Sequence, residues 1–123
     1  MVTRLAAAVG ALILLAAGAA QAAATDLEFY TGDELFAQCS AKPTDADYPP
    51  RSARCLGYVI GVSDALQAEQ GGGKPGVVCI QGATPATQLA DAVRSYLEAH
   101  PEKRRVAAPD LVISALTEAF PCR

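Results

Sequence analysis

The sequence has little of what catalysis and metal binding usually require. It contains no tryptophan, one methionine and a single histidine, His100, among 123 residues. His100 precedes Pro101 at the predicted end of a helix, where a cap or surface position is expected rather than a general base. No Cys-x-x-Cys pair is present, so the spacing of thioredoxin-like redox motifs and zinc knuckles is missing. We therefore expect no enzyme, no cofactor and no metal site.

Positive charge is also scarce. Lys and Arg number 10 against 13 Asp and Glu, which gives a formal net charge of -3. Proteins that bind nucleic acid present a basic face, so nucleic acid is not an expected partner. The one basic cluster, Lys103-Arg104-Arg105, falls between two predicted helices and is expected to be a solvated loop.

A long apolar run occurs only at the N-terminus, from Leu5 to Ala20 after the positive Arg4. A positive start, an apolar stretch and small residues at cleavage spacing are the three parts of a secretory signal peptide. Cleavage is expected after Ala22 or Ala24. An uncleaved membrane anchor is the alternative, but 16 residues, half of them alanine, are short for a span that needs about 20. We expect a signal peptide and an exported domain without a membrane anchor.

The four cysteines all lie in residues 25–123, the expected mature domain: Cys39, Cys55, Cys79 and Cys122. An even number of cysteines in a short exported chain predicts two disulfides. Three pairings are possible, and the sequence alone does not choose among them. If neighbouring helices form antiparallel hairpins, Cys39 pairs with Cys55 and Cys79 pairs with Cys122.

The first half of this domain contains two predicted helices. Thr31 and Glu34 have the spacing of a capping box, which starts a short helix. Residues 42–50 contain three prolines and two aspartates and are predicted to be a loop. From residue 51 to 69, apolar residues recur at steps of three and four, as in an amphipathic helix.

The second half contains two more. Thr84 is predicted to be an N-cap, followed by Pro85 at the first helical position, and this helix is expected to end at His100. A fourth helix begins near Pro109 and continues to Pro121. With almost no strand pattern, the predicted fold is all-α: a small four-helix domain of two helical hairpins held by two disulfides.

Two pairs of residues in the second helix invite a functional interpretation. Gly57 and Gly61 share one helical face and are expected to let another helix pack closely. Ser63 and Asp64 are adjacent, and adjacent helical residues point to different sides, so they are not expected to form part of a catalytic triad.

Several motifs carry a resemblance to a known family. They are Phe36-x-x-Cys39, Cys55-Leu-Gly-Tyr-Val-Ile-Gly-Val-Ser-Asp64, Val78-Cys79, Gln88-Leu89 through His100-Pro101, and Ala119-Phe-Pro-Cys122. In these the chain resembles the Tai-type immunity proteins, which neutralise type VI secretion amidase effectors. The resemblance implies a periplasmic helical inhibitor, often a homodimer, whose partner is a peptidoglycan amidase.

The family motifs do not include the residues that contact an effector. Three consecutive glycines follow the second helix, and this loop lacks the Gly-Lys-Ser/Thr ending of a phosphate-binding loop. By exposure, the expected partner contacts are Gln70, Gly71, Gly72, Gly73 and Lys74. The alternative function from another class is a periplasmic small-ligand carrier or stress chaperone, which predicts an apolar cavity or acid-induced exposure of the helix stripes.

Overall fold

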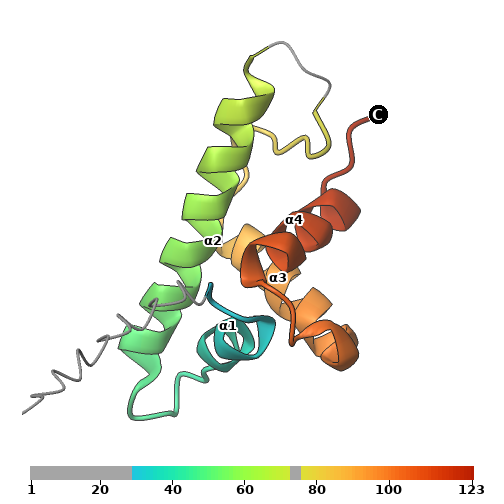
Figure 1. The fold of residues 1–123 in the computed structure, drawn as a ribbon. Coiled ribbons are helices and arrows are strands. Elements are labelled where there is room, and N and C mark those ends of the chain that lie inside the picture. The colour runs from blue at the N-terminus through green and yellow to red at the C-terminus, as the bar shows by residue number, and fades with distance from the viewer. Residues whose placement is uncertain (1–28, 73–75) are drawn as a thin grey trace, which may run out of the picture.

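The computed structural model describes residues 29–72 and 76–123, which form a bundle of helices (Figure 1). The elements are α1 (Gly32–Cys39), α2 (Tyr48–Gln70), α3 (Ala86–Ala99), the 3-10 helix η1 (Pro101–Lys103) and α4 (Ala108–Ala119). The predicted all-α class with four helices is confirmed. The signal peptide expected at residues 1–22 lies outside the described residues. No helix within the described ranges is long and apolar enough to cross a membrane.

The helices form two hairpins, and the predicted disulfide pairing is present. Cys39, the last residue of α1, is bonded to Cys55 in α2, and their Cα atoms are 4.9 Å apart. Cys79, ahead of α3, is bonded to Cys122 just beyond α4, again with Cα atoms 4.9 Å apart. Figure 1 shows α2 along one side of the molecule with the other three helices against it.

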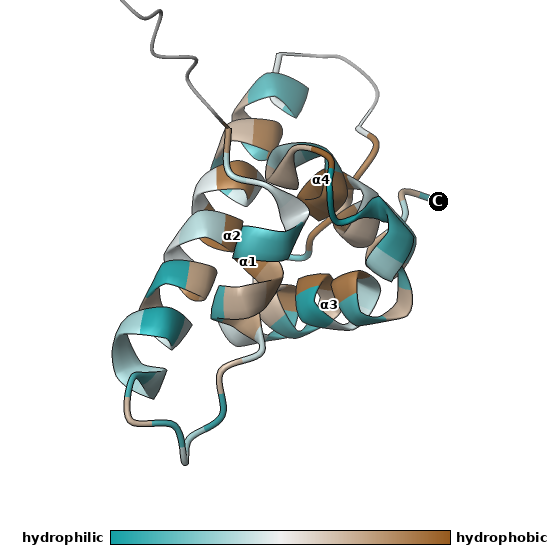
Figure 2. Ribbon diagram, turned by 60° about the horizontal axis from the view of Figure 1, so that its bottom comes forward, coloured by the Kyte–Doolittle hydropathy of each residue, from teal (hydrophilic) through white to brown (hydrophobic). Residues whose placement is uncertain are grey.

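The hydrophobic core lies where the four helices face one another. It takes one apolar stripe from each helix: Leu35 from α1, Val59 and Leu66 from α2, Leu89, Val93 and Leu97 from α3, and Leu111, Val112 and Leu116 from α4. In Figure 2 the hydrophobic turns face the middle of the molecule and most hydrophilic turns face outward. Ser63 is 2% exposed within this core, and its hydroxyl donates to the Val59 carbonyl oxygen at 2.7 Å, which satisfies it.

The first helix begins as predicted. The Glu34 amide donates to Thr31 Oγ1 at 3.3 Å, and the Thr31 amide donates to the Glu34 carboxylate at 2.7 Å. Both halves of the capping box are therefore present. The exchange satisfies two backbone groups that would otherwise lack partners at the start of the helix.

The predicted start of α2 is wrong by three residues and that of α3 by one residue. The second helix begins at Tyr48 rather than near residue 51, so Pro49 and Pro50 lie in its first turn. Proline is tolerated there because the first amides of a helix have no intrahelical acceptor. The third helix begins at Ala86 with Pro85 at the N-cap position and no capping hydrogen bond from a side chain, so Thr84 lies one residue before the cap, where its amide donates to the Gln81 carbonyl oxygen.

Gly57 and Gly61 do not mediate close helix packing in the described part of this chain. Both are exposed, and a Cβ added at either position would have no atom within 4 Å. The expectation fails because the packed face of α2 contains Cys55, Val59 and Leu66, whereas Gly57 follows Cys55 by two residues. Two residues turn a helix by about 200°, which places the glycines on the solvent side.

The glycine at a close approach is Gly32 instead. A Cβ at this position would collide with the Leu111 side chain and would lie 2.7 Å from the Arg104 carbonyl oxygen. The Gly32 amide also donates to the Val106 carbonyl at 3.0 Å, and Thr31 forms an antiparallel bridge with Ala107. The start of α1 is thus packed directly against the backbone that leads into α4.

Candidate functional site

The candidate binding loop follows α2 at one end of the molecule. In Figure 1 this end of α2 extends away from the centre of the bundle and continues into the loop. The described residues after the helix, Gly71 and Gly72, are exposed, and the Gly71 amide donates to the Gln67 carbonyl at 2.9 Å. Two of the predicted contacts, Gly73 and Lys74, lie outside the described residues.

Gln70 anchors this loop. Its side-chain Oε1 accepts a hydrogen bond from the Val78 amide at 3.2 Å, which joins the end of α2 to the returning chain. A Cβ at Gly76 would overlap the Gln70 amide group, so a larger residue there would require the Gln70 side chain to move. Gln70 is half-buried. Its contact with a partner stays a prediction, and its anchoring role is visible in the structure.

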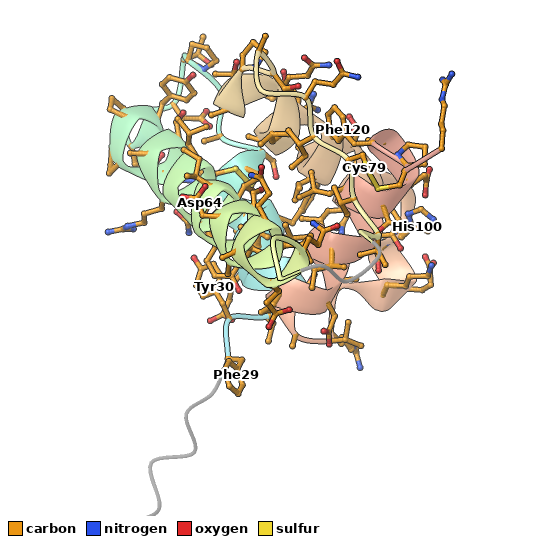
Figure 3. All side chains as sticks on the ribbon, turned by 90° about the horizontal axis from the view of Figure 1, so that it is seen from above. Phe29, Tyr30, Asp64, Cys79, His100 and Phe120 are labelled. Carbon is orange, nitrogen blue, oxygen red and sulfur yellow. A yellow bond between two sulfur atoms is a disulfide. The ribbon has the colours of Figure 1, made fainter. Side chains whose placement is uncertain are left out.

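The returning chain, residues 76–80, is called the strap here. Its Cys79 amide donates to the Phe120 carbonyl at 2.8 Å, and Val78 forms an antiparallel bridge with Pro121. Figure 3 shows Cys79 beside Phe120, and the disulfide to Cys122 closes the same junction. Both ends of the loop are therefore fixed, one by Gln70 and one by the C-terminal segment.

A cleft of about 550 Å³ separates the end of α2 from the strap. Three glutamines contribute to its wall, Gln67, Gln70 and Gln81, and the buried Val78 and half-buried Ile80 supply apolar surface. Its lining contains no ionisable side chain among the residues that the structure describes. Uncharged amides can donate and accept hydrogen bonds, so this cleft suits peptide-like groups better than ions. Beside it, Val77 is 52% exposed, a large apolar side chain in contact with water.

A second groove, of about 300 Å³, lies near the other end of α2 beside the Cys39–Cys55 disulfide. Gln38 lines it, and its Oε1 is buried with no hydrogen-bond partner. At the rim, Arg94 pairs with Asp91 at 3.8 Å and with Glu98 at 3.4 Å. The charged groups are thus paired with one another, while the Gln38 oxygen is unpaired.

The residues considered for chemistry have structural roles or are far apart. His100 caps α3: its Nδ1 is 2.8 Å from the Tyr96 carbonyl oxygen, and the two rings lie 4.2 Å apart. Ser63 is bonded to its own helix, and Asp64 is exposed. Figure 3 shows Asp64 and His100 on opposite sides of the molecule. Among residues 29–72 and 76–123, no three His, Cys, Asp or Glu side chains are grouped to hold a metal ion.

Two side chains have shifted pKa values, and both are outside the candidate site. Hydrogen bonds from the Thr31 amide and hydroxyl lower the pKa of Glu34 below its usual 4.5. Partial burial raises the pKa of Tyr58, and the neighbouring Tyr30, whose ring lies 5.3 Å away, and Asp110 raise it further. Tyr58 precedes the end of α2 by 12 residues, about 18 Å along the helix. The Glu34 shift therefore arises from the capping box and the Tyr58 shift mainly from burial.

The sequence indicated where the loop would be but not what fixes it. Nothing in the sequence around Gln70 shows that its side chain anchors the loop. The hydrogen bond from the Val78 backbone amide forms only after the chain turns back toward α2. The sequence signal for the position of the strap was the expected disulfide between Cys79 and Cys122, which places residue 79 next to the C-terminal segment.

The comparisons with known proteins give one result. A family profile described as Rap1a immunity proteins matches residues 31–122. No curated protein and no solved structure was found to match the chain. The matched region starts at the N-cap of α1 and ends at the last cysteine, so it includes all four helices and both disulfides. The chain therefore belongs to the Rap1a immunity protein family.

Proposed function

We propose that this protein is a periplasmic immunity protein of the Tai type, which binds and inhibits a peptidoglycan amidase delivered by a type VI secretion system. The match to the Rap1a immunity proteins is the observation that carries the proposal. The Tai-type motifs supply the enzyme class. The N-terminal signal pattern and the two disulfides support export, because structural disulfides persist in oxidising compartments.

Inhibition is proposed to occur by physical occlusion of the enzyme. The end of α2 extends from the bundle, so the loop after it can enter a concave surface that the body of the domain cannot. Its ends are held by Gln70 and by the strap, so less conformational freedom is lost on binding than with a loose loop. The proposed contacts are those expected from the sequence: Gln70, Gly71, Gly72, Gly73 and Lys74. Val77 joins them because it is exposed and apolar beside the same cleft.

The test requires a type VI amidase effector, for which the genes that neighbour this one are the first place to search. Purified immunity protein is added to that amidase acting on peptidoglycan, and release of new amino groups is followed. A tight inhibitor abolishes the activity at a one-to-one ratio. If the amidase keeps its full activity in excess immunity protein, the proposal is wrong.

Two matched variants test the loop. Val77→Asp places a charge at the loop. The control, Val106→Asp, makes the same change at a residue of similar exposure, 48%, which lies just before the first residue of α4. We expect Val77→Asp to weaken inhibition at least about tenfold, the effect of losing about 1.4 kcal/mol of binding free energy, and Val106→Asp to leave it unchanged. If both variants weakened inhibition equally, the loop would not be part of the interface, although the protein would still be an inhibitor.

The homodimer implied by the resemblance is part of the same proposal, and light scattering of the purified protein tests it. A small-ligand carrier receives less support. Such a protein would need an enclosed apolar cavity, whereas the cleft at Gln67, Gln70 and Gln81 is open and partly polar.

A further inference from the structure

The two disulfides differ in how far solvent reaches them. Cys55 is only 5% exposed and Cys39 is half-buried, whereas Cys79 is exposed and Cys122 is half-buried. Thiol–disulfide exchange begins when a thiolate reaches one sulfur of the bond, so access decides which bond is attacked and at which atom. Cys79 is the more exposed residue of the pair, so attack is expected at its sulfur, with the sulfur of Cys122 as the leaving group.

Open space and charge favour the same bond. Cys79 lines the 550 Å³ cleft and also a second hollow of about 460 Å³, whose wall includes Arg123. A cation near a disulfide attracts an incoming thiolate and stabilises the thiolate that leaves. The groove beside Cys39–Cys55 is smaller, about 300 Å³, and its Arg94 is paired with Asp91. That groove therefore offers an anionic thiol no comparable attraction.

We infer that Cys79–Cys122 is a thiol–disulfide exchange site for anionic small thiols. A thiolate attacks Cys79 Sγ, forms a mixed disulfide with it and expels Cys122 as a thiolate, which takes a proton from water. A second thiol molecule attacks the mixed disulfide and frees Cys79. In sum, two small thiols become one small disulfide, and the protein gains two electrons and two protons.

Exchange changes the restraint on the strap. With the covalent bond open, the strap is held by the buried Val78 side chain in the core, the Val78–Pro121 bridge, the hydrogen bond from the Cys79 amide to Phe120 and the bond to Gln70. None of these contacts is covalent, and Cys79 and Pro121 are exposed, so local opening at this end of the strap requires less free energy than in the oxidised protein. The Cys39–Cys55 bond is a separate disulfide and is not broken in this exchange.

The experiment treats the oxidised mature protein with glutathione, the anionic probe, and quenches samples with acid and an alkylating agent. Mass spectrometry of the peptides gives the opening rate of each disulfide, and hydrogen exchange follows the Cys79 amide. We expect Cys79–Cys122 to open at least about tenfold faster than Cys39–Cys55, with earlier exchange at the Cys79 amide. The inference is overturned if Cys39–Cys55 opens first or if both open together.

The charge argument has its own control. The cationic thiol cysteamine replaces glutathione, with rates corrected for the fraction of thiolate, and both probes are repeated on Arg123→Gln. We expect glutathione to react about two- to threefold faster than cysteamine with the native protein, and equally fast with Arg123→Gln. Arg123→Lys, which keeps the positive charge, should retain the preference. A preference that persists in Arg123→Gln would show that Arg123 does not select the thiol and would overturn this part of the inference.

Discussion

The guanidinium of Arg104 lies over the aromatic ring of Phe36, with Cζ 3.6 Å from the ring centroid. The same side chain donates from Nε to the Leu97 carbonyl oxygen at 2.6 Å. Leu97 is in the last turn of α3, where carbonyls have no intrahelical donor. One arginine thus joins α1 and α3. The expectation that residues 103–105 form a solvated loop is wrong for Arg104, which is half-buried.

Replacing Arg104 should lower stability. We expect Arg104→Ala to reduce the free energy of unfolding by about 2 kcal/mol, since it removes both the stacking on Phe36 and the hydrogen bond to Leu97. Arg104→Lys should lose less of the free energy of unfolding than Arg104→Ala but should not match the native protein, because an ammonium does not reproduce the planar guanidinium. The exposed neighbour Arg105 is the control, with a change within about 0.5 kcal/mol for Arg105→Ala. Urea denaturation measures all three, and equal losses at 104 and 105 would contradict the assignment.

The glycines of α1 and α2 should respond to alanine in opposite directions. Gly32→Ala forces a methyl group against the Arg104 backbone and should lower stability by about 2 kcal/mol. Gly57→Ala enters open space in the middle of a helix and should raise it by about 0.5–1 kcal/mol. Thermal unfolding of the two variants gives the comparison. A destabilising Gly57→Ala would indicate that this face is packed in solution, for instance in a dimer.

Acid should remove the contribution of the α1 capping box. Because the folded-state pKa of Glu34 is lowered, its contribution is fully present above the unfolded value near 4.5 and is lost as pH falls through the folded value. The difference in melting temperature between the native protein and Glu34→Ala should therefore be clear at pH 7 and should shrink well below pH 4. A difference that is the same at both pH values would mean that the ionised carboxylate is not what stabilises the helix start.

The unpaired oxygen of Gln38 predicts an unusual result for a buried polar residue. A buried hydrogen-bond acceptor without a donor is destabilising by about 1–3 kcal/mol, so removing this oxygen should not lower the free energy of unfolding. We expect Gln38→Met, which keeps the length of the side chain, to leave stability unchanged or to raise it by about 1 kcal/mol. The exposed Gln67→Met should change it by less than about 0.5 kcal/mol. A loss above 1 kcal/mol at Gln38, read from chemical denaturation, would reveal a hydrogen-bond partner in solution.

Features that depend on nearby residues were predictable from the sequence, and features that depend on tertiary packing were not. The capping box is visible in the spacing of Thr31 and Glu34, and the disulfides follow from cysteines that flank predicted hairpins. Gly32 and Gly57, by contrast, look alike in the sequence. Only the position of the backbone near Arg104 makes the first one crowded and leaves the second one open.

The candidate site divides in the same way. Consecutive glycines after a long helix predicted an exposed loop, and Gly71 and Gly72 are exposed. The anchoring by Gln70 and the crowding at Gly76 arise from contacts between the helix and the strap. Such contacts form only after the loop closes, so they cannot be predicted from a local sequence pattern.

The bridges at the two ends of α4 bear on how the domain folds. Thr31 pairs with Ala107 before the helix, and Val78 pairs with Pro121 after it. Each pair joins segments that are far apart along the chain, so each forms only after a long stretch of chain has been ordered. The Thr31–Ala107 bridge joins the first hairpin to the second, and the Val78 amide is bonded to Gln70 at the end of α2, so a chain cut between α2 and α3 would lose the contacts that join its two halves. The two hairpins should consequently fold and unfold together, as a single cooperative unit.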